Sequence, residues 1–200
     1  MNKSKAAWKL SLVAILLILL SIVFYFNDGQ KYKASYTDKD DGLLTLHFQN
    51  GSSRTFVDRK GESSSDNISY KLSHYFAEEG FFAIHETYYE GYGGLVVSAK
   101  DGTEYETFCG TPVFSKDGQW MVTYCMDIAA GFSKNGLEIW KVKDGILEKS
   151  FSVEPDWGPE NVKWAEDNIV TFHKMAWKDN EVVNSGLGRL SLVNWKWQLE

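Results

Sequence analysis

The stretch that decides the fold is Gly136–Phe151, with the sequence GLEIWKVKDGILEKSF, which predicts a tight β-hairpin. An apolar strand runs into Asp144-Gly145, two residues that tolerate the positive φ angles of a two-residue hairpin turn. The pattern recurs upstream, because Gly93–Phe108 keeps the same spacing and Gly42–Phe56 shortens its second interval by one residue. The hairpin is therefore one copy of a repeated structural unit.

The chain from Tyr32 onward carries short apolar or alternating runs, separated by Gly, Asp and Asn turns. No segment of helical length keeps a 3.6-residue apolar period, so the runs predict an all-β, antiparallel domain. We expect a short first set of strands and three further sets of four. The expected strands lie at 32–37 and 43–56, at 68–75, 81–89 and 95–108, at 112–115, 120–125 and 136–151, and at 161–165, 169–176 and 189–199.

The spacing of these sets is typical of a small β-propeller. Phe56, Phe108 and Phe151 close successive hairpins at intervals of roughly 40 to 50 residues, a period that four-stranded propeller blades show. The strand 120–125, WMVTYC, is apolar at nearly every position, which predicts a strand covered on both faces by neighbouring sheets. The sets make about four blades, few for a propeller, so an incomplete propeller or a twisted β-sandwich is the alternative.

Residues Thr111–Thr123, TPVFSKDGQWMVT, resemble the WD40-like repeat of TolB and related bacterial β-propellers. Blades of that family begin with Pro, an aromatic residue and Ser-Pro-Asp-Gly, and here Lys116 stands where the family prefers the second Pro. Val162–Asp167 is a degenerate second copy, with Asn168 where Gly would be expected. The resemblance covers these two repeats and not the first half of the domain. It implies a propeller fold and a scaffold role, with no catalytic residues to carry over.

The N-terminal segment Leu10–Phe26 is apolar and uncharged. With the residues just before it, the segment reaches about 21 residues, or roughly 30 Å as a helix, which predicts a transmembrane signal anchor. A cleaved signal peptide is the competing interpretation, but Phe24–Phe26 is bulky where small residues would be needed. Because three lysines precede the anchor, we expect a single-pass membrane protein with its N-terminus in the cytoplasm. The expected parts are a cytoplasmic segment at 1–9, the anchor at 10–26, a stalk at 27–33 and a periplasmic or extracellular β domain at 34–200.

The acidic balance of the chain bears on its partners. The net charge is −6, and three of the 21 basic residues precede the anchor, so the domain itself is more acidic still. Nucleic acid is not expected as a partner, because phosphate binding needs a basic surface. An acidic surface is compatible with a basic protein partner, although it also serves solubility alone.

Cys109 and Cys125 are the only two cysteines and flank the turn predicted at Ser115–Gly118. If Phe114 faces Gln119 across that turn, the cysteines come within one residue of directly opposite each other. Thiols placed in this way oxidise outside the cytoplasm, so we expect a structural disulfide. Two buried free thiols are the alternative.

Aromatic loops are the candidate binding sites. The four histidines are scattered and neither HExxH nor GxSxG occurs, so we expect no catalytic residue, metal or cofactor. The loops 88–94 and 154–160 combine aromatic with acidic or flexible residues, as interface anchors do, and the connections 128–135 and 178–186 are expected on the same face as the first. In a structural interpretation the same aromatics only pack against sheet edges. The candidate binding residues are Tyr88, Tyr89, Tyr92, Phe132, Asp156 and Trp157.

These observations favour binding rather than catalysis. We expect a membrane-anchored extracytoplasmic scaffold that holds a protein partner, either as an immunity-type inhibitor or as a subunit of an envelope assembly. The alternative is a hydrolase or carbohydrate-binding domain with a site built from Glu90, Asp156 and Glu160. The sequence identifies no small-molecule ligand.

Overall fold

The computed structural model describes residues 33–39 and 42–200, and Ala34–Glu200 form one compact unit. The predicted cytoplasmic segment, the anchor and all of the stalk except Lys33 lie outside the described residues. Within the part of the chain that is described, no helix is long and apolar enough to cross a bilayer.

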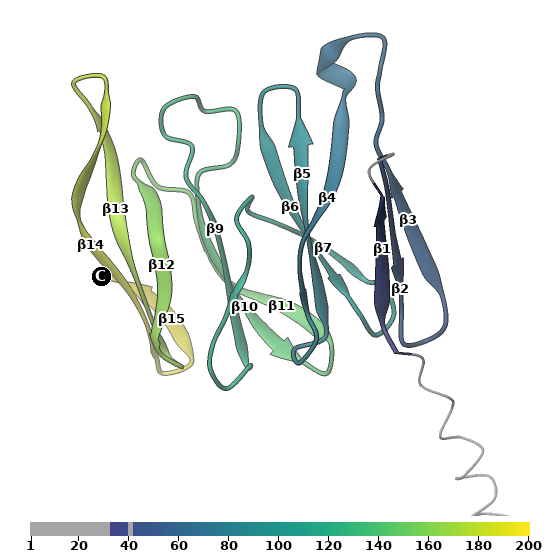
Figure 1. Ribbon diagram of the computed structural model, residues 1–200. Coiled ribbons are helices and arrows are strands. Elements are labelled where there is room, and N and C mark those ends of the chain that lie inside the picture. Colours follow the sequence, from purple (N-terminus) through teal and green to yellow (C-terminus); the bar gives the residue numbers. More distant parts are fainter. Residues whose placement is uncertain (1–32, 40–41) are drawn as a thin grey trace, which may run out of the picture. The chain divides into compact units, whose positions relative to one another are not determined.

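The strands form four antiparallel sheets in chain order (Figure 1). The first sheet holds β1 (Ser35–Lys39), β2 (Leu43–His47) and β3 (Ser53–Val57). A 3-10 turn, η1 (Ser64–Asp66), leads to the second sheet, which holds β4 (Ile68–Phe76), β5 (Phe81–Tyr88), β6 (Tyr92–Ser98) and β7 (Glu104–Thr107). The third holds β8 (Val113–Phe114), β9 (Trp120–Cys125), β10 (Gly136–Lys143) and β11 (Ile146–Val153). The fourth holds β12 (Gly158–Glu166), β13 (Ile169–Lys178), β14 (Glu181–Val193) and β15 (Lys196–Leu199).

The hairpin at Gly136–Phe151 forms as predicted. β10 and β11 pair from Leu137 and Val153 to Lys143 and Ile146, with one register shift between Ile139 and Trp140. Asp144 and Gly145 make the two-residue turn with φ angles of 53° and 78°. Both central residues have positive φ, the condition for the turn type that matches the twist of the flanking strands. The all-β, antiparallel prediction is therefore confirmed at the level of strands and sheets.

The connection predicted at 178–186 is wrong as a loop. β13 continues to Lys178 and β14 begins at Glu181, so only Asp179 and Asn180 are left as the turn, with φ angles of 51° and 64°. Asn and Asp tolerate positive φ better than other non-glycine residues, which allows a tight turn without the Gly that normally signals one. The polar residues of the predicted loop, apart from Asp179 and Asn180, are therefore paired in β13 and β14.

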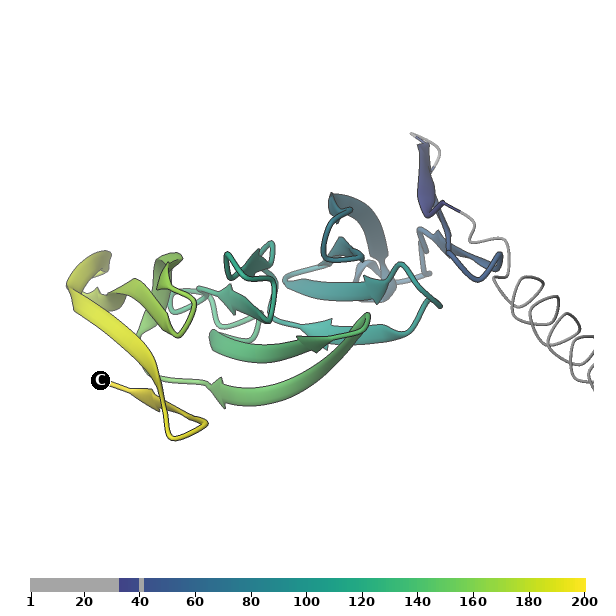
Figure 2. The ribbon, with the colours of Figure 1, turned by 90° about the horizontal axis from the view of Figure 1, so that it is seen from below.

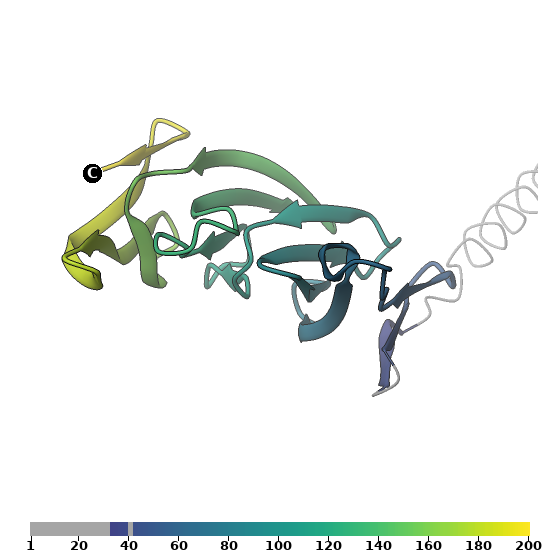
Figure 3. The same cartoon turned by 90° about the horizontal axis from the view of Figure 1, so that it is seen from above.

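Successive sheets share their cores. One buried cluster joins the first and second sheets, another joins the second and third, and another joins the third and fourth. On β5, Phe82 packs toward the first sheet while Phe81 packs toward the third; on β9, Met121 packs toward the second sheet and Val122 toward the fourth. The third sheet accordingly lies between the second and the fourth in both perpendicular views (Figure 2, Figure 3).

This packing explains why the second strands read as continuous apolar runs. Both faces of β5 and β9 are covered, so adjacent residues are buried together, and the prediction of strands covered on both faces is confirmed. Because the clusters join only neighbours in chain order, the four sheets do not close into a ring within the described residues.

The disulfide between Cys109 and Cys125 is present, with Cα atoms 5.1 Å apart. The predicted register was wrong, because Phe114 pairs with Met121 rather than with Gln119. The turn lies one residue later than expected: the Ser115 amide donates to the Trp120 carbonyl at 2.9 Å, so the four-residue turn is Lys116–Gln119 rather than Ser115–Gly118. In the observed register the two cysteines are still only one residue away from being directly opposite, so the disulfide can form.

Candidate functional site

Two loops from adjacent sheets meet beside the disulfide. The β5–β6 connection comprises Tyr89–Gly91, and the β9–β10 connection comprises Met126–Asn135. A Cβ atom at Gly91 would come within 2.7 Å of the Phe132 carbonyl oxygen, so this close approach requires glycine. The Tyr92 amide donates a hydrogen bond to the Ser133 hydroxyl at 2.9 Å, which ties the two loops together.

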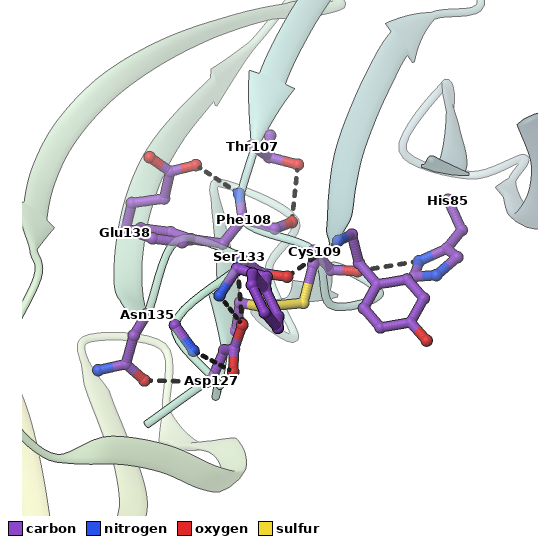
Figure 4. The surroundings of a disulfide bond; sticks show 12 residues. His85, Thr107, Phe108, Cys109, Asp127, Ser133, Asn135 and Glu138 are labelled. Atoms are coloured by element: carbon purple, nitrogen blue, oxygen red, sulfur yellow. Dashed lines mark hydrogen bonds between the residues drawn. A yellow bond between two sulfur atoms is a disulfide. The ribbon is translucent and has the colours of Figure 1, made fainter. Parts of the chain in front are cut away.

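The Asp127 carboxylate organises the β9–β10 loop from within (Figure 4). It accepts four backbone hydrogen bonds of 2.6 to 3.2 Å, from the amides of Ala130, Gly131, Phe132 and Ser133. Burial acts to raise the pKa of Asp127, but these amides outweigh it and hold the pKa below its usual value. An ionised carboxylate at the centre thus fixes a loop that has no regular secondary structure.

The same loop is tied to the segment that precedes the fourth sheet. The Asn135 side-chain amide donates to the carbonyl oxygens of Pro155 and Trp157, both at 2.9 Å, while its oxygen accepts from the Asp127 amide at 3.2 Å. The disulfide fixes the end of β9 immediately before the loop begins. The loop is therefore held at both ends and at its centre.

Four aromatic side chains from these two loops and the strands beside them are exposed, and we call them the aromatic surface. Their exposed fractions run from 42% for Tyr88 to 58% for Tyr89 and Phe132, with Tyr92 at 53%. Tyr92 is held in place by stacking on His85, with ring centroids 5.2 Å apart. Exposed aromatics on a fixed backbone lose little conformational entropy on binding, which is the property of interface anchors.

A cleft with a volume of about 510 Å³ opens beside the aromatic surface. Its walls come from the first three sheets, and Tyr88, Tyr92 and Phe132 of the aromatic surface belong to its lining. The other side chains used below are Arg54, Phe56, Tyr70, Glu86, Glu104, Glu106, Lys134, Glu138, Lys149 and Glu154.

Two of the acidic side chains in the cleft are paired. Arg54 Nε lies 2.7 Å from Glu104 Oε1, and Lys149 Nζ lies 2.7 Å from Glu138 Oε2. Among the described residues, no ion pair involves the other ionisable side chains of the lining, which are Glu86, Glu106, Glu154 and Lys134. The unpaired charge of the cleft is therefore negative.

Glu86 is the half-buried acid of the cleft. The Tyr88 hydroxyl donates to Glu86 Oε2 at 3.0 Å, and Gly93 on the neighbouring strand leaves room for both side chains, because a Cβ there would lie 2.8 Å from that carboxylate. Burial raises the pKa of Glu86, the Tyr88 hydrogen bond opposes the shift, and the charges of Glu106 and Glu104 add to it. Burial and the Glu86 charge together raise the pKa of Tyr88 to about 12.

Glu138 is a structural acid. Only 2% of the residue is exposed, and its carboxylate accepts from the Thr123 hydroxyl at 3.0 Å and from the Phe108 amide at 3.3 Å, in addition to the Lys149 ion pair. Lys149 also lies over the Trp140 ring, 4.6 Å from its centroid. These contacts join β9, β10 and β11 to the end of the second sheet.

The structure places the six predicted binding residues in two groups. Tyr88, Tyr92 and Phe132 line the cleft, and Tyr89 is exposed next to them. Asp156 is exposed elsewhere, and Trp157 stacks on Phe172 of the shared core with ring centroids 5.2 Å apart. The loops 88–94 and 126–135 are thus brought together. Trp157, by contrast, packs into the core, as expected if the aromatic residue has only a structural role.

The carboxylates named for the hydrolase alternative do not line the cleft. Glu90, Asp156 and Glu160 lie outside its lining, which holds Glu86 and Glu106 instead. Within residues 33–39 and 42–200, no group of three His, Cys, Asp or Glu side chains is placed to hold a metal ion.

The sequence was compared with models of known protein families and with curated proteins. It matches no family model and no curated sequence.

Proposed function

We propose that this protein is a membrane-anchored, extracytoplasmic binding protein whose aromatic surface holds a protein partner. The observation that carries the proposal is the set Tyr88, Tyr89, Tyr92 and Phe132, exposed together on two loops and the strand ends beside them, which the Tyr92–Ser133 hydrogen bond joins. Large aromatics beside a polar rim are the residues that dominate protein–protein binding energies. An immunity-type inhibitor and a subunit of an envelope assembly are the two roles that fit such a surface.

The preorganisation of the loops supports this proposal. Asp127, the Ser133 hydroxyl and the disulfide at Cys109 fix the β9–β10 loop before any partner arrives. Ordering a flexible loop on binding costs affinity, and a loop already held in place avoids that cost.

We further propose that the domain is a propeller-like scaffold of the TolB-type repeat class. The Ser115 hydroxyl donates to Asp117 at 2.6 Å and accepts from the Trp120 amide at 3.0 Å, so the repeat residues form one local network. The two repeats also touch, because the Asp117 amide donates to Asp167 at 3.1 Å and the Trp164 indole donates to the Val113 carbonyl at 2.8 Å. Equivalent turns in contact are expected of neighbouring blades.

Membrane attachment is proposed from the apolar segment Leu10–Phe26. Retention of the chain in the membrane pellet after alkaline carbonate extraction, with an intact N-terminus by mass spectrometry, is the expected result. Release of the chain, or a mature N-terminus beyond Phe26, contradicts the anchor.

The binding function is tested by affinity capture of the tagged full chain from detergent-solubilised envelopes. Tyr92→Ser and Phe132→Ser are expected to lower partner recovery at least tenfold, because anchor residues typically cost more than about 1.4 kcal/mol when truncated. Trp195→Ser is the matched control, since Trp195 is 84% exposed and outside the cleft lining. If the same amount of partner is recovered with Tyr92→Ser, Phe132→Ser and Trp195→Ser, the proposal is contradicted.

A hydrolytic or carbohydrate-binding role is the second candidate, and Glu86 is the observation that favours it. A carboxyl with a raised pKa inside an aromatic-lined cleft has the property required of a general acid. Turnover of a chromogenic glycoside panel by the wild-type chain, lost in Glu86→Gln, would establish this candidate over the binding function.

A further inference from the structure

We propose that the cleft is a socket for one lysine or arginine side chain of the partner, which Glu86 and Glu106 hold at the charged end. This inference rests on the proposed function, because it takes the occupant to be a side chain of the protein that the aromatic surface binds.

The charge of the cleft favours a cation. Arg54 and Lys149 are already neutralised by Glu104 and Glu138, at 2.7 Å each. Glu86, Glu106 and Glu154 have no ion-pair partner among the described residues, and Lys134 is the one unpaired cation of the described lining, so a net negative charge remains. The charge of Glu106 also acts to raise the pKa of Glu86. Bringing a cation between like charges relieves their repulsion, whereas an anion would add to it.

The walls of the cleft fit the apolar stem of such a side chain. Phe56 and Tyr70 pack together, with ring centroids 5.4 Å apart, and both line the cleft with Tyr88. The Arg54 guanidinium lies 5.3 Å from the centroid of the Phe56 ring, so these walls already hold one basic side chain of the protein itself. Aromatic rings stabilise a cation through their negative faces and its methylene groups through apolar contact.

Glu86 is half-buried and makes few polar contacts within the fold. Its only hydrogen bond among the described residues is the one from Tyr88, whereas the buried Glu138 has three polar partners. A partner ammonium or guanidinium group would supply the missing donors. Glu138 is thus fully occupied within the fold, whereas Glu86 keeps hydrogen-bonding capacity for a ligand in the cleft.

The test uses the ¹⁵N-labelled full chain in a non-ionic polyoxyethylene detergent, titrated with N-acetyl-lysine methylamide and followed by NMR. N-acetyl-norleucine methylamide is the control probe, because it keeps most of the stem and lacks the charge. We expect saturable shifts of the Gly93, Gly94 and Thr107 amides, which line the cleft, with lysine amide only. Equal shifts with both probes, or shifts with maltotriose but not with lysine amide, overturn the proposal.

Charge-neutral variants locate the contact. Glu86→Gln is expected to weaken lysine-amide binding about tenfold, since a charge-assisted hydrogen bond is replaced by a neutral one. Glu166→Gln makes the same change at an exposed acid outside the cleft and is expected to leave binding unchanged. An unchanged dissociation constant in Glu86→Gln, with amide spectra that show the variant folded, overturns the assignment.

Failure of this inference is distinguishable from failure of the proposed function. If Phe132→Ser abolishes partner capture while lysine amide fails to bind, the binding surface stands and the socket falls. If lysine amide binds and Glu86→Gln weakens it, but no partner depends on Phe132, the socket stands as a cation site and the proposed function falls.

Discussion

The backbone amide of Tyr92 donates a 2.9 Å hydrogen bond to the hydroxyl of Ser133, and this bond joins a loop of the second sheet to a loop of the third. It is the direct link between the two halves of the aromatic surface. Ser133 itself is fixed by the Asp127 carboxylate, which accepts its amide. The position of Tyr92 therefore depends on a residue 35 positions further along the chain, Asp127, acting through Ser133.

Replacing Ser133 tests this link. Ser133→Ala removes the acceptor of the Tyr92 amide and is expected to cost about 1 kcal/mol or less in unfolding free energy, because the amide can turn to water. Partner capture should fall more steeply than stability does. Ser185→Ala, which removes an exposed hydroxyl bonded to the Lys174 carbonyl, is the control. If Ser133→Ala and Ser185→Ala lower partner capture equally, the Tyr92–Ser133 hydrogen bond does not position the aromatic surface.

Asp127 should make the stability of the fold depend on pH. Its folded pKa is lower than its ordinary value near 3.8, so its contribution to stability is present above that value and is lost as the pH falls through the folded pKa. Asp127→Asn is expected to cost about 1 to 2 kcal/mol at pH 6, since hydrogen bonds to a charged group are exchanged for weaker ones. The difference between wild type and variant in urea unfolding should shrink below pH 4. A difference that stays constant from pH 6 to pH 3 contradicts the role given to the ionised carboxylate.

Lys149 neutralises the buried acid of the third sheet. Lys149→Met is expected to lower the unfolding free energy by about 2 kcal/mol, less than the roughly 3–5 kcal/mol of fully buried pairs because Lys149 is partly exposed. The double variant with Glu138→Gln should recover part of the loss, because no unpaired charge remains. Lys163→Met, at an exposed lysine of β12, serves as the control in the same urea titration. No difference between the two single variants would show that Glu138 does not need Lys149.

The disulfide should matter for both stability and binding. Replacing Cys109 and Cys125 with serine opens a 16-residue separation and is expected to cost about 3 kcal/mol in unfolding free energy. The end of β9 then loses its attachment to the second sheet, so the β9–β10 loop and partner capture should be affected as well. Thermal unfolding of the oxidised, reduced and double-serine chains measures the effect, and equal midpoints for all three would contradict it.

The sheets could be predicted because their signals are local. Turn residues such as Asp144-Gly145 and apolar runs such as 120–125 act over a few positions, and repetition multiplied the signal. The exceptions are also local: Asp179-Asn180 makes a tight turn without glycine, and the turn after Phe114 lies one residue later than predicted, which moved the register of β8 and β9.

The cleft was less predictable, because it is assembled from distant segments. Tyr92 and Phe132 stood out as aromatics beside glycines, but Glu86 and Arg54 gain their meaning only when the first and second sheets pack together. Glu138 did carry a signal, since an acid within a strand that is apolar on both faces has to be satisfied inside the fold. Trp157 misled for the opposite reason, because its acidic neighbours hide a core contact with Phe172.

Site-specific photo-cross-linking tests the central claim most directly. A benzoylphenylalanine placed at Phe132 of the full chain in intact cells should give a discrete protein adduct, because this side chain is 58% exposed on the aromatic surface. The same probe at Trp195, which is 84% exposed and outside the cleft lining, should give none. An adduct at Phe132 alone is the result we predict. No adduct at Phe132, or equal adducts at both positions, would contradict the assignment of this surface to a protein partner.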